Sequence, residues 1–191
     1  KVFLPPTFAH QMAIPLLQDF RAEQPDITLE IASKPATNPN DGDADVAVVY
    51  KQPEVSTSIL DLLWMVQLSV VCTPKVAQRI VDADLAAIVS SNDLLHVKLE
   101  GRPRHEFWEM FMRRAGHPEI KVNRGLVFDT AQLAVQYALS GEGLALVDPM
   151  LFKAEIASGK LVQPFDILLD DGYGYYLATH PEDLNNEAVA L

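Results

Sequence analysis

The feature that most limits the fold of this chain is a regular alternation of short apolar runs with longer amphipathic runs. The apolar runs predict strands, and the amphipathic runs between them predict helices. This order is typical of an α/β protein whose open sheet is mainly parallel and whose crossovers are right-handed. The predicted strands cover residues 2–4, 27–31, 46–50, 68–72, 96–99, 126–128, 144–147 and 173–178.

The first predicted helix follows Pro5-Pro6 and runs to about Glu23, with Thr7 as its N-cap. Pro15 lies inside this span and predicts a kink or a division into two pieces, because proline lacks the N–H that a continuous helix uses. The apolar residues of the span are four apart, as a single buried stripe requires. They are Phe8, Met12, Leu16 and Phe20.

The later helices carry boundary signals of their own. Asp129 is predicted as the N-cap of a helix over 129–139, with Gln132 three residues later as in a capping box. Pro149 is predicted at the first position of another helix, which Gly159 ends. Further helices are predicted from about residue 75, over 107–115 and over 182–191, whereas 33–44 is predicted as a proline-rich loop.

Size and charge exclude several classes of protein. The 191 residues suit two small lobes of roughly 100 residues each. A net charge of −11 makes the chain a poor partner for DNA, whose phosphates are neutralised by Lys and Arg. The sequence has neither an apolar run of the roughly 18 residues that span a bilayer nor an initial signal peptide. The single cysteine, Cys72, excludes an intramolecular disulfide, and the composition fits a cytoplasmic protein.

Several segments, taken together and in order, resemble the effector-binding domain of LysR-type transcription regulators. The resemblance covers nearly the whole chain and is greatest for the branch that contains glycine-cleavage and β-lactamase regulators. The matching segments are Pro5-Pro6-Thr7-Phe8-Ala9, Ile14-Pro15-Leu16-Leu17, Pro25-Asp26-Ile27, Asp45-Val46-Ala47-Val48, Val70-Val71-Cys72-Thr73-Pro74, Trp108 to Ala115-Gly116, Phe128-Asp129-Thr130, Gln132-Leu133-Ala134, Gly141-Glu142-Gly143-Leu144-Ala145-Leu146, Gly159-Lys160-Leu161-Val162 and Pro164-Phe165.

The resemblance implies a fold like that of the type 2 periplasmic binding proteins, with two Rossmann-like lobes joined by two crossover strands. Lobe I would comprise residues 1–71 and 175–191, and lobe II residues 72–174, with the C-terminal helix truncated. An N-terminal winged helix-turn-helix would be absent from this chain, so that DNA is bound only through the missing domain. A homodimer or tetramer is also implied, in which the helix over 8–23 meets a helix near 75–83 of another copy.

The same resemblance implies that a small effector, with an anionic group such as a carboxylate, binds in a cleft between the lobes. Helix N-termini attract anions because their first N–H groups lack helical partners. Thr7 and Thr130 each follow a strand and open a predicted helix, and the resemblance favours both as ligand-binding residues. The candidate ligand-binding residues are Thr7, Phe8, Ser33, Lys34, Lys98, Val127, Phe128, Asp129, Thr130 and Tyr175. Tyr175 and Tyr176 alternate on one strand, and the sequence leaves open which of them faces the ligand.

Other residue patterns are weaker. Cys72 between apolar residues is predicted to be a buried thiol, and the five histidines lack metal-ligand spacing. Gly141-Glu142-Gly143 follows a predicted helix, the reverse of a phosphate-binding loop, and is predicted as a tight turn. Asp41, Asp43 and Asp45 lack the later glutamate of a calcium loop. No catalytic residues, metal or cofactor are therefore predicted. An exported solute-binding protein of the same fold is the alternative function, and an enzyme is a less favoured one.

Overall fold

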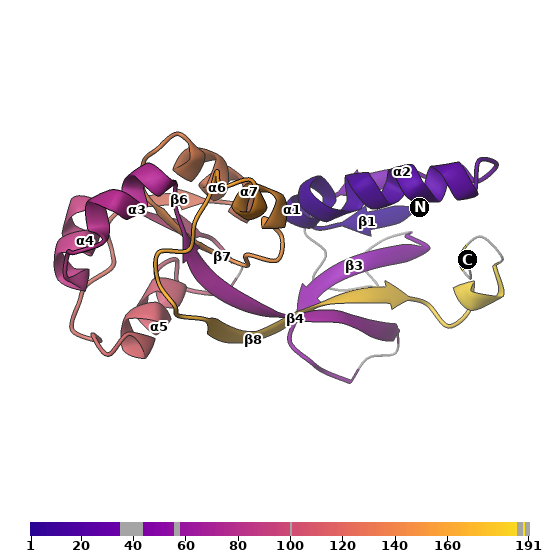
Figure 1. Ribbon diagram of the computed structural model, residues 1–191. Helices are drawn as coiled ribbons and strands as arrows, with labels where there is room; N and C mark the ends of the chain where they lie inside the picture. Colours follow the sequence, from indigo (N-terminus) through magenta and orange to yellow (C-terminus); the bar gives the residue numbers. More distant parts are fainter. Residues whose placement is uncertain (35–43, 56–57, 100, 187–188, 190–191) are drawn as a thin grey trace. The chain divides into compact units, whose positions relative to one another are not determined.

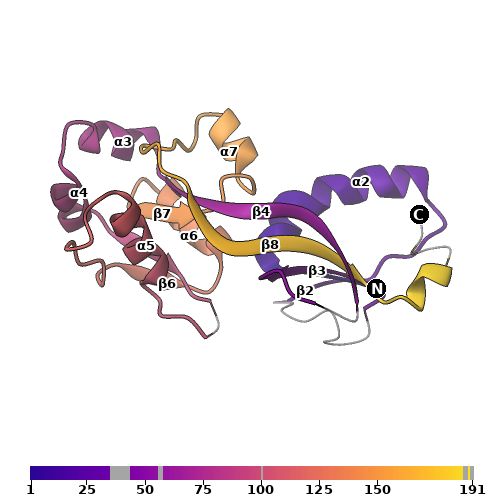
Figure 2. The same cartoon turned by 90° about the horizontal axis from the view of Figure 1, so that it is seen from below.

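A computed structural model of the chain describes residues 1–34, 44–55, 58–99, 101–186 and 189. They form two compact units: unit 1 comprises Lys1–Val66 and Gly172–Leu191, and unit 2 comprises Gln67–Asp171. Strands β4 (Ile59–Val71) and β8 (Leu169–Thr179) each contribute residues to both units. Figure 1 shows the elements, and Figure 2 shows β4 and β8 side by side.

The sheet of unit 1 has the strand order β2-β1-β3-β8-β4. β1 runs parallel to both β2 and β3, whereas β8 runs antiparallel to β3. β3 is almost wholly buried, as its continuous apolar run predicts for an inner strand. The strands that belong to this unit alone are β1 (Val2–Leu4), β2 (Ile31–Ser33) and β3 (Val46–Lys51).

One helical run in unit 1 changes its geometry twice. It begins as α1 (Pro6–Phe8), continues as a π-helix, η1 (Ala9–Ala13), and ends as α2 (Ile14–Glu23). The break predicted at Pro15 therefore takes the form of a wider turn just before the proline. This turn moves the preceding carbonyls away from the proline ring, so the helix continues past a residue that would otherwise end it.

The prediction that Thr7 caps this helix is wrong. The N-cap is Pro5, which has extended backbone angles and makes no side-chain capping hydrogen bond. Proline is favoured at the first helical position because its φ is already helical, and Pro6 therefore starts the helix two residues earlier than predicted. Thr7 lies inside the helix and is buried.

Unit 2 has the strand order β4-β7-β5-β6, in which β5 is parallel to both β6 and β7 and β4 is antiparallel to β7. Its core includes the fully buried side chains of Trp108, Phe111 and Phe152. The elements are α3 (Pro74–Ile80), α4 (Leu85–Ser91), β5 (Leu94–Val97), α5 (Glu106–Arg114), β6 (Leu126–Phe128), α6 (Ala131–Leu139), β7 (Leu144–Val147) and α7 (Lys153–Ala157).

The strands predicted over 46–50, 126–128 and 144–147 are confirmed as β3, β6 and β7. The strand predicted over 27–31 is wrong, because β2 begins at Ile31, opposite Val2. The neighbouring strand β1 ends at Leu4 before a proline, and it offers only three residues for pairing.

Other boundaries also differ from the prediction. β4 begins at Ile59 and not at Leu68, and β5 covers Leu94–Val97 and not 96–99. The helix predicted from Pro149 begins at Lys153, because residues 149–152 form turns. In the stretch 182–191, the described part contains a 3-10 turn, η2 (Asp183–Asn185), and residues 187–188 and 190–191 lie outside the described residues, as do 35–43 of the predicted loop.

Candidate functional site

Five aromatic rings of unit 1 form a continuous cluster. Phe8 stacks on Trp64 at 5.9 Å between ring centroids, and Tyr175 lies 5.6 Å from Phe8 and 4.9 Å from Trp64. Tyr50 joins them at 5.3 Å from Tyr175 and stacks on Tyr173 at 4.8 Å. We call these residues, which come from α1, β3, β4 and β8, the aromatic cluster.

The pairing of β3 with β8 explains why these rings meet. Tyr50 lies opposite Tyr175 in the antiparallel register, and Tyr173 is two residues away on the same face. Tyr176 points to the other face, where it packs with Phe3 in the core of unit 1. Within this unit Tyr176 thus belongs to the core and Tyr175 to the aromatic cluster, and both are buried.

Only some of the predicted residues of unit 1 are brought together. Thr7 and Phe8 are both buried at the start of the helical run, and Phe8 contacts Tyr175. Ser33 is exposed at the end of β2. The ammonium of Lys34 lies 3.6 Å from the ring centroid of Phe3, a cation–π contact on the core side of the sheet. Ser33 and Lys34 are therefore not part of the aromatic cluster.

The predicted residues of unit 2 gather at the carboxyl ends of two paired strands. Val97 lies opposite Phe128, and the backbone N–H of Lys98 donates to the carbonyl of Phe128 at 2.8 Å. Lys98 is exposed, Val127 is 40% exposed, and the ring of Phe128 lies 5.9 Å from that of Tyr137.

Thr130 is the N-cap of α6, since its hydroxyl oxygen accepts a hydrogen bond from the N–H of Leu133 at 3.2 Å. The prediction that Asp129 caps this helix is wrong by one residue: Asp129 is exposed beside the cap. This region thus combines a lysine, a helix N-terminus and one carboxylate. Lys98 and the N-terminus favour an anion there, and Asp129 opposes one that comes too near.

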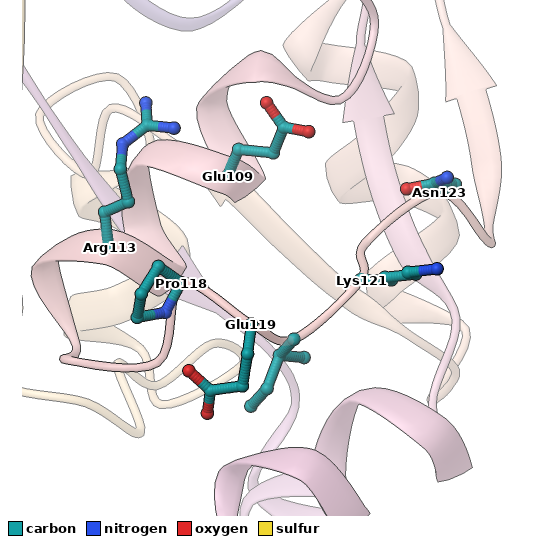
Figure 3. Close-up of a pocket in the computed structure, with 7 residues that line it drawn as sticks. Glu109, Arg113, Pro118, Glu119, Lys121 and Asn123 are labelled. Atoms are coloured by element: carbon teal, nitrogen blue, oxygen red, sulfur yellow. The ribbon is translucent and has the colours of Figure 1, made fainter.

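A polar depression of about 440 Å³ lies elsewhere in unit 2, beside α5 (Figure 3). It contains none of the predicted site residues. Two acidic and two basic side chains share its wall, so its charge gives no preference for an anion or a cation. The pKa of Glu119 is lowered by a hydrogen bond from its own backbone N–H and by His117. The lining residues are Glu109, Arg113, Pro118, Glu119, Ile120, Lys121 and Asn123.

Cys72 is buried, as predicted, and burial raises its pKa to about 11, which keeps the thiol protonated and unreactive at neutral pH.

Gly141 and Gly143 have positive φ angles of 95° and 77°, which confirms the predicted turn between α6 and β7. Asp41 and Asp43 lie outside the described residues. Within the described part of the chain, no group of three or more His, Cys, Asp or Glu side chains could hold a metal ion, and no helix could cross a membrane.

Three members of the aromatic cluster are missing from the predicted site: Tyr50, Trp64 and Tyr173. The spacing of Tyr173 and Tyr175 by two residues was a usable signal, because residues i and i+2 of a strand share a face. Tyr50 and Trp64 carry no comparable local signal, because their contact with β8 depends on strand pairing between distant segments.

Comparisons with known proteins agree along the whole chain. The family model described as the LysR substrate binding domain matches residues 1–191. The HTH-type transcriptional activator AmpR of Citrobacter koseri is 30% identical over 168 residues, which are 87% of this chain and 56% of that protein. The glycine cleavage system transcriptional activator of Escherichia coli K12 is 27% identical over 181 residues, 94% of this chain and 57% of that protein.

Among solved structures, the effector domain of the transcriptional regulator AmpR of Pseudomonas aeruginosa is similar with a TM-score of 0.78 and 25% identity. The match covers 99% of this chain and 88% of that one. The chain spans just over half the length of the curated relatives that it matches.

Proposed function

The chain belongs to the LysR substrate binding domain family, and on this premise we propose that it is the effector-sensing part of a LysR-type transcription regulator. It binds a small molecule and thereby controls DNA binding by a winged helix-turn-helix that is not in this chain. The names of the two curated relatives, both transcriptional activators, support this role. The net charge of −11 supports it too, because a separate basic domain must then contact the DNA.

The observation that carries the ligand assignment is that Lys98 follows the end of β5 and the N-terminus of α6 follows the end of β6, where the two parallel strands are paired. We propose that an anionic group of the effector, such as a carboxylate, binds there. The ammonium of Lys98 offers a charge, and the first turn of α6 offers N–H groups. Val127 and Phe128 supply apolar surface, and the exposed Asp129 limits how close a second negative group can come.

The predicted residues of unit 1 lie in a different environment. Thr7, Phe8 and Tyr175 are buried on or beside the aromatic cluster, where packing between rings holds Phe8 and Tyr175. We propose their part in ligand binding on the family resemblance alone. Ser33 and Lys34 stay candidates as predicted from the sequence, but the position of Lys34 over Phe3 makes them the weaker part of the set.

The proposed regulator acts without a cofactor and is not an enzyme, and it works in the cytoplasm, where its DNA is. Self-association into a homodimer or tetramer is part of the proposal. Apolar side chains that could serve it are exposed on α2, where Ile14 and Leu16 are more than half exposed, and just after α3, where Val81 is 76% exposed. These are the two helical regions that the family resemblance predicts to meet across copies.

The proposal is tested first by a thermal-shift screen of small carboxylic acids, because a compound that binds only the folded chain raises its melting temperature. Calorimetric titration of a compound so identified then compares the parent with Thr130→Val and Lys98→Met. We expect each variant to bind about tenfold to a hundredfold more weakly.

Thr73→Val is the matched control, since Thr73 is also an N-cap but makes no side-chain capping bond. Unchanged affinity in both site variants, with folding intact, would place the effector elsewhere. A chain that binds no compound in an extended screen, and a full-length protein that does not bind DNA, would contradict the regulatory function itself.

A further inference from the structure

A buried histidine in unit 2 makes two hydrogen bonds to groups of the same kind. His96 lies on β5 and is 1% exposed. Its Nδ1 is 3.1 Å from the carbonyl oxygen of Arg104, and its Nε2 is 2.9 Å from the carbonyl oxygen of Arg124. Carbonyl oxygens only accept, whereas a neutral imidazole has one donor nitrogen and one acceptor nitrogen. Both contacts are hydrogen bonds only if both ring nitrogens carry a proton.

The two carbonyls belong to segments that approach β5 from different parts of the chain. Arg104 lies just before His105, the N-cap of α5, and Arg124 lies two residues before β6. The side chain of Arg104 also donates to the carbonyl of Asn123 at 3.3 Å, which ties the two segments to each other. His96 therefore lies at a junction of three segments.

The approach of the second segment to β5 is very close. Gly125 has a φ of 117°, and a Cβ built at this position would lie 1.9 Å from the carbonyl oxygen of Leu94. Only glycine allows this approach. The bond from His96 to Arg124 therefore holds a backbone that already lies against β5, immediately before β6 begins.

The junction leads directly to the proposed ligand-binding residues of this unit. His96 is opposite Val127 in the β5–β6 register, and two residues further on the N–H of Lys98 donates to the carbonyl of Phe128. Thr130 and the N-terminus of α6 follow. A displacement of the segment before β6 would thus move the end of β6 relative to Lys98.

We propose that His96 is a positioning residue of unit 2: its ring is protonated on both nitrogens and holds the entries to α5 and to β6 against β5. That these entries position a ligand-binding region rests on the proposed function. The double protonation of His96 and its two hydrogen bonds, which together we call the clamp, do not rest on it. Among the charged groups of the two segments, Arg102 is paired with Glu106, and Arg104 and Arg124 are exposed. Among the described residues, the backbone carbonyls of Arg104 and Arg124 are therefore the groups that stabilise a positive charge on the ring.

The protonation is tested by nitrogen NMR of the ¹⁵N-histidine-labelled chain, without any ligand, near neutral pH. We expect the ring of His96 to show two protonated nitrogens, and loss of its signals in His96→Gln assigns them. The exposed His117, whose Nδ1 lies 3.2 Å from a carboxylate oxygen of Glu119, gives the reference for a ring in exchange with solvent. The pattern of a single neutral tautomer at His96 would overturn the proposal.

Two variants separate the two bonds. The side-chain amide of Asn reaches about as far as Nδ1 of histidine, and that of Gln about as far as Nε2. His96→Asn should therefore keep the bond to Arg104 and release Arg124, and His96→Gln should do the reverse. We expect backbone amides of β6 to exchange with solvent about tenfold faster or more in His96→Asn, and those at the start of α5 in His96→Gln, with β7 unchanged in both.

Equal acceleration of all these amides in both variants would mean that His96 only fills space, and would contradict the clamp. If one variant fails to fold, the NMR measurement on the parent still decides. A doubly protonated His96 in a chain for which no effector is ever found would leave the clamp intact and count against the proposed function alone.

Discussion

The two units carry proposed ligand-binding residues at comparable places, the start of a helix after a strand, but they build them by different means. In unit 1 the residues are buried, with Thr7 and Phe8 both 6% exposed, and aromatic packing fixes them. In unit 2 Thr130 and Lys98 are more exposed, and backbone hydrogen bonds and a helix cap fix them. The same pattern in sequence, a threonine after a short strand, thus leads to two different environments.

The difference begins with the residues just before each threonine. Pro5-Pro6 start the helix early and place Thr7 inside it, whereas Asp129 leaves the extended backbone to continue as far as Thr130. It follows that substitutions in unit 1 should act mainly on stability, and substitutions in unit 2 mainly on ligand binding and on the helix end. The predictions below test this division.

The largest effect is expected for Phe8→Ala. The buried ring contacts both Trp64 and Tyr175, and its removal leaves a cavity among rings, which should lower the free energy of unfolding by about 3–5 kcal/mol. Urea denaturation followed by tryptophan fluorescence measures it. The matched variant Phe128→Ala removes a half-buried ring that contacts the ring of Tyr137, and it should lower the free energy of unfolding clearly less. Equal costs would show that the two units are not built differently.

A smaller and more specific effect is expected when the two threonines are changed to serine, which keeps the hydroxyl and removes the methyl. Thr7→Ser should lower the free energy of unfolding by about 1 kcal/mol, because a buried methyl is lost. Thr130→Ser should change it by less than about 0.5 kcal/mol, because serine is an equally good cap.

Thr130→Val gives the complementary result for the second threonine. It removes the capping oxygen and should cost about 1 kcal/mol. If Thr130→Ser proves as destabilising as Thr130→Val, the hydroxyl of Thr130 is not what stabilises the start of α6. Differential scanning calorimetry of the three variants and the parent makes this comparison.

Much of the fold follows from local patterns. The family resemblance and the two-lobed α/β class are confirmed, and the strands β3, β6 and β7 lie within a residue of the predicted bounds. These strands are continuous apolar runs bounded by turn residues, so their signal is local. The helix starts were predicted less well, since competition between neighbouring capping residues decided the outcome at both Thr7 and Asp129.

The rest depends on contacts between distant segments. β2 is short because β1, almost 30 residues earlier, offers few partners, and the aromatic cluster exists because β3 pairs with β8. The two contacts of His96 have no local signal, because nothing near His96 in sequence indicates the carbonyls of Arg104 and Arg124. Strand register and the paths of loops between strands carry this information, and a single sequence does not display it.

The smallest effect is expected at an ion pair of unit 2 that has no counterpart at the start of the helical run in unit 1. Arg102 Nε donates to Glu106 at 2.8 Å, and this hydrogen bond, together with the charge of Arg102, lowers the pKa of Glu106 below its ordinary value of 4.5. A carboxyl whose pKa is lowered in the folded chain stabilises the fold above the unfolded pKa, and that contribution disappears as the pH falls through the folded value.

Because the pair is partly exposed, its contribution to the free energy of unfolding should be below about 1 kcal/mol. The free energies of unfolding of the parent and of Glu106→Gln, measured by urea denaturation, should therefore differ slightly at pH 6 and converge as the pH falls below the unfolded pKa of about 4.5 and through the lowered folded value. Asp19→Asn on α2, an exposed position in unit 1, is the control for the loss of one carboxylate elsewhere in the chain. A difference for Glu106→Gln that stays constant across this range would mean that the substitution acts through packing and not through the charge of Glu106.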